Sequence, residues 1–159
     1  MPEPLANRPP GTITVLSFSP AESDHAVLER TFRESSLTLY PNCRLALQRG
    51  RTIASTVAAL RSHRIPIVLC DLDGQAEARR EILQASRDLP APPCVIVTSR
   101  ADDDRLWAEL LNGGAFDLLS KPFEASTVIR IIHSAWVHWQ NRHGQEDGTK
   151  DCRESATGT

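Results

Sequence analysis

The sequence has little of what marks a nucleic-acid-binding protein or a membrane protein. Its 18 basic residues are balanced by 20 acidic ones, so it lacks the basic excess that favours DNA or an anionic membrane surface. No run of about 18 apolar residues occurs, and the N-terminus lacks a basic start followed by an apolar stretch. We therefore expect a cytoplasmic protein with neither nucleic acid nor membrane as a partner.

Metal-binding and catalytic motifs are also missing. The five histidines have no metal-ligand spacing with one another or with the cysteines, which themselves lack C-x-x-C spacing. We expect the cysteines to be reduced and structural; they are Cys43, Cys70, Cys94 and Cys152. No glycine-rich phosphate loop follows the first apolar segment, and no nucleophile–base pair stands out other than Asp71 with Lys121. The sequence therefore does not predict an enzyme.

Proline and polar residues mark both ends of the chain. Residues 1–11 hold four prolines and a glycine, a composition that disfavours both helix and sheet. From Asn141 onward the sequence is polar and aperiodic. We predict disordered tails over residues 1–11 and 141–159, and between them one folded domain over residues 12–140 that is long enough to bury a core.

Strand-like and helix-like segments alternate between these tails. The apolar segments with strand character are 13–16, 43–47, 67–70, 94–97 and 116–119. Each is followed by a segment with helical character, and a capping box over residues 19–22 is predicted to open the first helix. The alternation predicts a single α/β domain with a doubly wound parallel sheet. Five β/α units with strand order 2-1-3-4-5 would give the flavodoxin-like arrangement.

Three polar residues stand where a hydrophobic run ends. Asp71 follows the third predicted strand, Thr98 the fourth and Lys121 the fifth. Because the carboxyl ends of parallel strands share one edge of a sheet, we expect a carboxylate, a hydroxyl and an ammonium to lie in one crevice.

Segments 67–72, 94–99 and 114–123 together resemble a response-regulator receiver domain, and the resemblance extends over residues 12–140. It implies that Asp71 accepts a phosphoryl group from a sensor histidine kinase or a phosphotransfer protein. It also implies that Lys121 pairs with one phosphoryl oxygen and that Thr98 hydrogen-bonds another. In the family's pattern the Lys121–Pro122 peptide bond is cis, which a bond preceding proline sustains at modest cost.

The residues at the end of the first strand depart from that family. Receivers hold Mg²⁺ with an acidic pair there, whereas this chain has Ser17 and Phe18. A hydroxyl and a phenyl ring are poor ligands for a hard dication, and two orientations of Phe18 stay open: its ring closes part of the metal's space, or it turns away. We therefore expect Mg²⁺ binding, and with it phosphotransfer, to be weakened.

Other acids offer partial compensation. By the resemblance, Asp71 and the main-chain carbonyl of Asp73 remain as metal ligands, and the side chain of Asp73 would add a second carboxylate. Glu22 or Asp24, from the start of the first helix, is an alternative source of a carboxylate. The expected metal ligands are thus Asp71 and Asp73, in a weak site.

Signal output also departs from the family's pattern. Leu118 stands where receivers commonly place an aromatic residue that rotates as the threonine moves, so the aromatic switch is absent. Trp107, Trp136 and Trp139 lie on the last two predicted helices, where receivers have a partner or dimer surface. Two interpretations stay open: the tryptophans form an interaction face toward a downstream protein or a second copy, or all three are core.

Two functions remain open at this point. The first is a stand-alone response-regulator receiver in bacterial two-component signalling, phosphorylated on Asp71 and acting through protein contacts. The second is a phosphorylation-independent pseudo-receiver that serves as an interaction or dimerisation module. In the second case Asp71 and Lys121 form only a residual salt bridge.

Overall fold

The computed structural model describes residues 11–39, 44–71, 76–100 and 104–143. Five strands alternate with five helices in these ranges. The strands are β1 (Thr12–Phe18), β2 (Arg44–Gly50), β3 (Ile67–Asp71), β4 (Cys94–Ser99) and β5 (Asp117–Ser120). The helices are α1 (Glu22–Leu39), α2 (Ile53–Ser62), α3 (Ala76–Arg87), α4 (Asp104–Asn112) and α5 (Ala125–His143).

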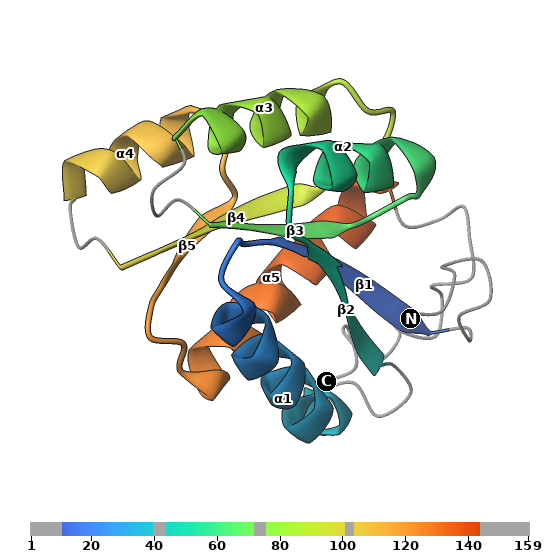
Figure 1. Ribbon diagram of the computed structural model, residues 1–159. Helices are drawn as coiled ribbons and strands as arrows, with labels where there is room; N and C mark the ends of the chain where they lie inside the picture. The colour runs from blue at the N-terminus through green and yellow to red at the C-terminus, as the bar shows by residue number, and fades with distance from the viewer. Residues whose placement is uncertain (1–10, 40–43, 72–75, 101–103, 144–159) are drawn as a thin grey trace.

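All neighbouring strands pair in parallel, in the order β2-β1-β3-β4-β5. Helices α1 and α5 cover one face of the sheet, and α2, α3 and α4 cover the other, so the molecule has three layers (Figure 1). The predicted flavodoxin-like α/β fold, including its strand order, is confirmed.

The sheet divides the core into two sides. On the α1–α5 side, Ile13 and Val15 of β1 pack with Leu69 of β3. On the α2–α3 side, Leu16 of β1 packs with Val68 of β3. Because side chains alternate along a strand while both faces of this sheet are covered, the central strands read in sequence as continuous apolar runs rather than as an alternation.

The start of α1 differs from the prediction. The Ser19 hydroxyl accepts a hydrogen bond from the Ala21 N–H (3.1 Å) and donates one to the Asp24 carboxylate (3.0 Å). The predicted reciprocal bond between Ser19 and Glu22 is absent from these contacts, because the Glu22 carboxylate instead pairs with arginines at the end of β2. The helix therefore begins at Glu22, and the serine orients an acid one turn further on.

Other boundaries also shift. Helix α5 continues to His143, beyond the predicted domain boundary at residue 140. Strand β2 extends to Gly50, because its predicted polar end pairs with β1 up to Phe18. The predicted tails over residues 1–10 and 144–159, and the predicted start of β2 at Cys43, lie outside the described residues.

The three tryptophans do not form one exposed face. Trp136 and Trp139 are 1% and 2% exposed, stack on each other with ring centroids 5.7 Å apart, and belong to the core on the α1–α5 side. Trp107 is half-buried on α4, on the opposite side of the sheet, where it packs against a cluster containing Leu118. The prediction of a shared interaction face is wrong, since a helix that covers a sheet centre buries its largest residues there.

The two described cysteines are free and buried. Burial, reinforced by the charge of Asp71, raises the pKa of the Cys70 thiol to about 12. Burial also raises the pKa of Cys94, to about 11. Both are protonated and pack as small apolar residues, as the sequence predicts. Cys43 and Cys152 lie outside the described residues.

None of the helices in the described ranges combines the length and the apolar character needed to cross a bilayer.

Replacing Trp136 should destabilise the fold strongly. We expect Trp136→Ala to lower the free energy of unfolding by about 3–5 kcal/mol, because a large buried side chain is lost and the space is only partly refilled. Urea denaturation followed by circular dichroism measures this change. Leu111→Ala is the matched control, since Leu111 is 46% exposed and its loss should cost well under 1 kcal/mol. Equal losses in the two variants would contradict the assignment of Trp136 to the core.

Candidate functional site

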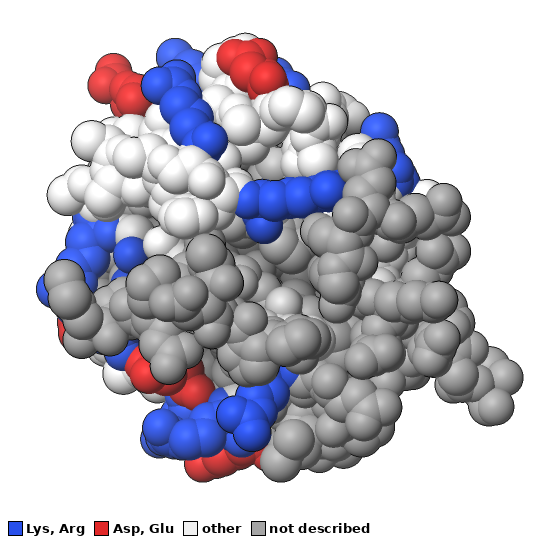
Figure 2. All heavy atoms as spheres, turned by 90° about the vertical axis from the view of Figure 1, so that its right-hand side faces the viewer, with Lys and Arg blue, Asp and Glu red and all other residues white. Residues whose placement is uncertain are grey.

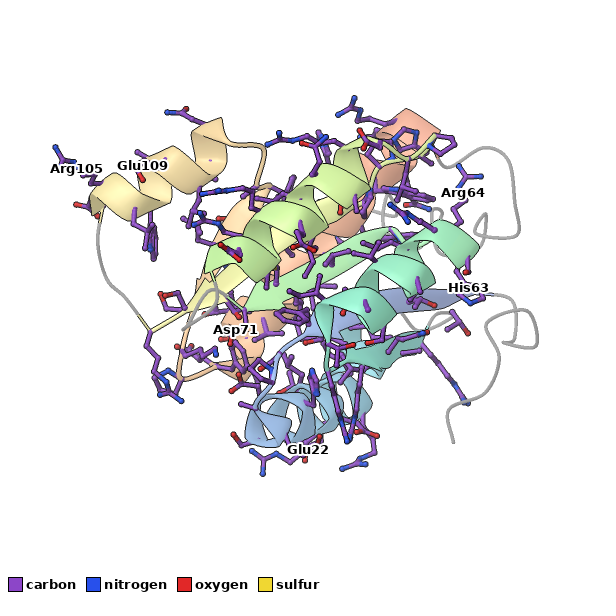
Figure 3. All side chains as sticks on the ribbon, turned by 45° about the horizontal axis from the view of Figure 1, so that its top comes forward. Glu22, His63, Arg64, Asp71, Arg105 and Glu109 are labelled. Carbon is purple, nitrogen blue, oxygen red and sulfur yellow. The ribbon has the colours of Figure 1, made fainter. Side chains whose placement is uncertain are left out.

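The three residues singled out by the sequence meet at one edge of the sheet. Asp71 is the last residue of β3, and Thr98 of β4 lies directly beside it in the strand register. Lys121 follows the end of β5, and its main-chain N–H donates to the carbonyl of Ser99 (2.9 Å). Figure 3 shows Asp71 at this edge, close to the start of α1, with His63 and Arg64 at the far end of the molecule. The Lys121–Pro122 peptide bond is cis, as the resemblance implies.

A double ion pair forms the centre of the site. The Nζ of Lys121 lies 2.6 Å from Oδ1 of Asp71 and 2.7 Å from Oδ2 of Asp24. The Lys121 and Asp71 side chains are each only 4% exposed, and that of Asp24 is 10% exposed. Charged groups in this setting are tolerated when they are paired and hydrogen-bonded, and here one ammonium serves two carboxylates.

The charge of Lys121 is set by opposing effects. Burial lowers its pKa, but the hydrogen bonds that it donates to Asp24 and Asp71 and the charges of both carboxylates raise it, and the net shift is upward. Lys121 is therefore an ammonium at neutral pH. Its contribution to stability is complete below its ordinary pKa and is lost as the pH rises through the raised value.

Asp24 is the functional residue that the sequence named only as one of two alternatives. Residues 22 and 24 differ by about 200° around a helix, so only one of them faces the site. Asp24 faces Lys121 and is held by the Ser19 hydroxyl. Glu22 points away and pairs with Arg49 and Arg51, in keeping with its outward position in Figure 3. The sequence carried no signal for this choice, because it depends on the rotation of α1 about its axis.

Phe18 does not occupy the space beside Asp71. Its ring is 1% exposed and belongs to the cluster on the α2–α3 side that also contains Leu16 and Cys70. Of the two orientations that the sequence left open, Phe18 therefore has the one that turns away from the site, because strand alternation directs its ring to the other face. Ser17, the residue on the site's side, is buried and neutral.

The donor set around Asp71 meets only the minimum that Mg²⁺ requires. Among the described residues there is no group of three or more His, Cys, Asp or Glu side chains able to hold a metal ion. Asp71 and Asp24 supply two carboxylates, and Mg²⁺ commonly binds one or two carboxylates and fills its other positions with water. These two residues fit such an ion, which would have to share them with Lys121. Asp73, the predicted second ligand, lies outside the described residues.

Thr98 and Leu118 connect the site to α4. Thr98 is 4% exposed, and the preceding residue, Val97, pairs in register with Leu118. Val97 and Leu118 form a small cluster against which Trp107 of α4 packs. An aromatic ring thus lies beside the position where the sequence lacks one, but it comes from the helix rather than from the strand.

His25 lies behind the site and is fully buried. Its Nε2 is 3.2 Å from the carbonyl oxygen of Ser17, and its Nδ1 has no partner among the described residues. Burial lowers the pKa of His25, and this effect outweighs the Ser17 hydrogen bond and the charge of Glu22, which raise it. The ring is therefore neutral at neutral pH and donates from Nε2, a packing role that agrees with the absence of metal spacing in the sequence.

Comparison with known proteins gives structural matches only. No family model and no curated protein matches the chain. A response regulator from Thermotoga maritima is 18% identical, with a TM-score of 0.67, and the match covers 78% of this chain and 97% of that one. The signal receiver domain of a Luxo repressor protein from Vibrio parahaemolyticus is 15% identical, with a TM-score of 0.71 and coverage of 86% and 98%. The chemotaxis response regulator CheY4 of Vibrio cholerae is 15% identical, with a TM-score of 0.64, and the match covers 78% of this chain and 98% of that one. The chain therefore has the fold of response-regulator receiver domains.

Acidification should destabilise the protein through His25. The folded state binds a proton on this ring less readily than the unfolded chain does, so the free energy of unfolding falls as the pH drops below the ordinary value of 6.5. The slope from this one group is at most about 1.4 kcal/mol per pH unit. We expect His25→Gln, which keeps a donor for the Ser17 carbonyl, to show a flatter profile in urea denaturation between about pH 7.5 and pH 5.5. His63→Gln, at an exposed position, is the control. If its free energy of unfolding depends on pH as weakly as that of His25→Gln, then His25 is not the source of the acid sensitivity.

Proposed function

We propose that this chain is a cytoplasmic receiver domain of a two-component signalling system, with Asp71 as its phosphoacceptor. The observation that carries the proposal is the 2.6 Å contact between Asp71 and Lys121 at the carboxyl edge of the sheet, beside Thr98. A nucleophilic carboxylate, a fixed cation and a hydroxyl donor are the groups that phosphoryl transfer to a carboxylate needs. The receiver fold supports the same conclusion.

The chemistry is a single displacement at phosphorus. A carboxylate oxygen of Asp71 forms a bond to phosphorus while the bond from phosphorus to the donor breaks, and the leaving group keeps the electron pair. The donor is the phosphohistidine of a sensor kinase or of a phosphotransfer protein, and the product is an acyl phosphate. Lys121 stabilises the negative phosphoryl oxygens, and the Thr98 hydroxyl donates to another of them. The chain transfers no group to a further substrate, so it is not an enzyme in the ordinary sense.

Asp71 and Asp24 would hold Mg²⁺ at this site. When bound, the ion supplies positive charge to the phosphoryl oxygens. We expect weak binding, because both carboxylates already contact the Lys121 ammonium and the acidic pair of other receivers is replaced by Ser17 and Phe18. Asp24 therefore has two roles in the proposal: it holds Lys121 in place, and it replaces one of the missing acids.

Output is proposed to pass through protein contacts on the α4 side. A movement of Thr98 toward a phosphoryl group would shift its neighbour Val97 and the adjoining Leu118. Trp107 packs against these two residues and would shift with them. The buried Trp136 and Trp139 take no part in this route.

One observation favours the alternative of a phosphorylation-independent pseudo-receiver. Lys121 contacts both carboxylates, and no third acidic, histidine or cysteine side chain joins them among the described residues. Each of the two carboxylates thus has an ion-pair partner within the chain without a ligand. In this alternative the fold acts as a constitutive interaction module.

Acetyl phosphate should label the protein on Asp71. Incubation with acetyl phosphate and Mg²⁺ is expected to give a phosphoryl adduct by intact-mass spectrometry. Asp71→Asn should abolish the adduct, because an amide oxygen is a far weaker nucleophile than a carboxylate. The exposed Asp88→Asn is the matched control and should be labelled like the wild type. An unlabelled wild-type protein, alongside a receiver that labels under the same conditions, would favour the pseudo-receiver.

Asp24→Asn should weaken the binding of the Mg²⁺ that supports labelling. We expect the Mg²⁺ concentration for half-maximal labelling to rise by about tenfold, the scale on which loss of a group that supports a metal reduces affinity. Glu22→Gln removes an acid from the same helix turn that pairs only with arginines in the contacts described, so it should leave the dependence unchanged. The same Mg²⁺ requirement in Asp24→Asn and in the wild type would rule out Asp24 as part of the ion's site.

A further inference from the structure

A second cavity lies at the opposite end of the sheet from Asp71. It has a volume of about 370 Å³ and is bordered by the end of α3, the first residue of β4, the turn before β5 and the end of α5. Small-molecule sites typically have volumes of about 300–1,000 Å³, so the cavity is large enough for a small organic ligand. Neither proposed function makes use of it.

The lining of this cavity is cationic. It includes Arg87 of α3, Arg142 of α5 and two histidines, His138 and His143, and no lining residue is acidic. Within the described part of the chain, neither guanidinium has an ion-pair or hydrogen-bond partner. Arginine presents a planar set of donors that matches phosphate and carboxylate groups.

A buried donor without an acceptor lines the same cavity. Trp139 is 2% exposed, and its indole Nε1 has no hydrogen-bond partner among the described residues. Its ring is fixed by Trp136 on one side, by the His143 ring (5.5 Å between centroids) and by the Arg64 guanidinium (5.1 Å from the ring centroid). Trp139 therefore contributes a fixed aromatic ring to the lining of the cavity.

The turn before β5 ends α4 and lies against Arg87. Gly114 has φ of +110°, a conformation that L side chains rarely adopt. A Cβ atom at this position would lie 2.9 Å from an Nη atom of Arg87, so glycine also gives the guanidinium room against the turn. The positive φ of Gly114 closes α4, since the Ala115 N–H donates to the Leu110 carbonyl, and the exposed Arg87 side chain lies against this turn.

Helix-end electrostatics explain only part of this arrangement. Arg87 and Arg142 stand in the last turns of α3 and α5, where the helix dipole favours a cation. That effect operates on each helix separately and does not require the two ends to converge on one cavity. A neighbouring hollow extends the basic surface, since it shares Arg142 and His143 and adds Arg61, His63 and Arg64. Lys and Arg side chains are prominent on the described part of the face in Figure 2, and Figure 3 labels two of the added residues, His63 and Arg64.

We propose that this cavity is a binding site for a small organic anion that carries phosphate or carboxylate groups. Arg87 and Arg142 hold the anionic groups, and the Trp139 ring forms part of the wall of the cavity beside them. The site is separate from Asp71 and does not depend on phosphorylation.

Titration followed by NMR tests the proposal directly. The chain has three tryptophans and hence three indole N–H resonances. The variant Trp107→Phe assigns the resonance of Trp107, because that signal disappears. A Phe variant of Trp136 or Trp139 then distinguishes the other two. The probes are pyrophosphate and citrate, added at constant ionic strength. We expect a saturable shift of the Trp139 resonance with at least one of them, while the Trp107 resonance stays in place. Saturation by pyrophosphate alone identifies phosphate groups as the ligand chemistry, and saturation by citrate alone identifies carboxylates.

Charge variants separate a built site from general attraction of anions. Arg87→Gln and Arg142→Gln should each weaken binding by about tenfold, the loss expected from one charge-assisted hydrogen bond. Arg30→Gln, which removes an exposed arginine of α1 outside the cavity, should bind like the wild type. Unchanged backbone amide spectra verify that each variant is folded. The proposal is overturned if neither anion gives a saturable Trp139 shift, if the Trp107 resonance moves in parallel, or if all three arginine variants bind equally.

Discussion

The Lys121 ammonium shared by two carboxylates is the interaction on which the functional edge of this protein depends. Its partners come from the end of β3 and the first turn of α1, while the lysine itself follows β5. Removing Lys121 would leave two nearly buried carboxylates without compensation, which is much more costly than losing a surface ion pair, whereas removing either acid leaves the lysine paired with the other. The same contact therefore positions the candidate phosphoacceptor and fastens α1 to the sheet.

The site also shows how a missing acid can be replaced from another element. The end of β1 carries a neutral serine and a phenylalanine that turns into the core, yet a second carboxylate still reaches Lys121 from α1. The Ser19 hydroxyl makes this possible, because it holds Asp24 instead of closing a capping box with Glu22. A change of helix start by a few residues thus determines which acid faces the site. The second cavity likewise combines residues from different elements, since the ends of α3 and α5 line it although they are distant in sequence.

Much of the fold and three residues of the candidate site were predictable from local patterns. The apolar runs gave the five strands, and the polar residues at their ends identified Asp71, Thr98 and Lys121. The choice between Glu22 and Asp24 was not predictable, because it depends on the rotation of α1 about its axis. The burial of Trp136 and Trp139 was not predictable either. An apolar stripe shows which face of a helix turns toward the sheet, but not how completely each residue on it is buried. Arg87 and Arg142 become neighbours of one cavity only through tertiary packing.

The inward turn of Phe18 has a consequence for how the folded protein responds to its ionic surroundings. Where a strand end contributes several acids to a crevice, these carboxylates repel one another, and a bound counter-ion is needed to lower the electrostatic free energy of the folded state. Here that strand end contributes hydrocarbon to the core, and the remaining acids share a cation that is covalently part of the chain. The two carboxylates and the one ammonium leave a single net negative charge at this edge, so the folded resting state needs less charge compensation from a bound cation than a cluster of acids would.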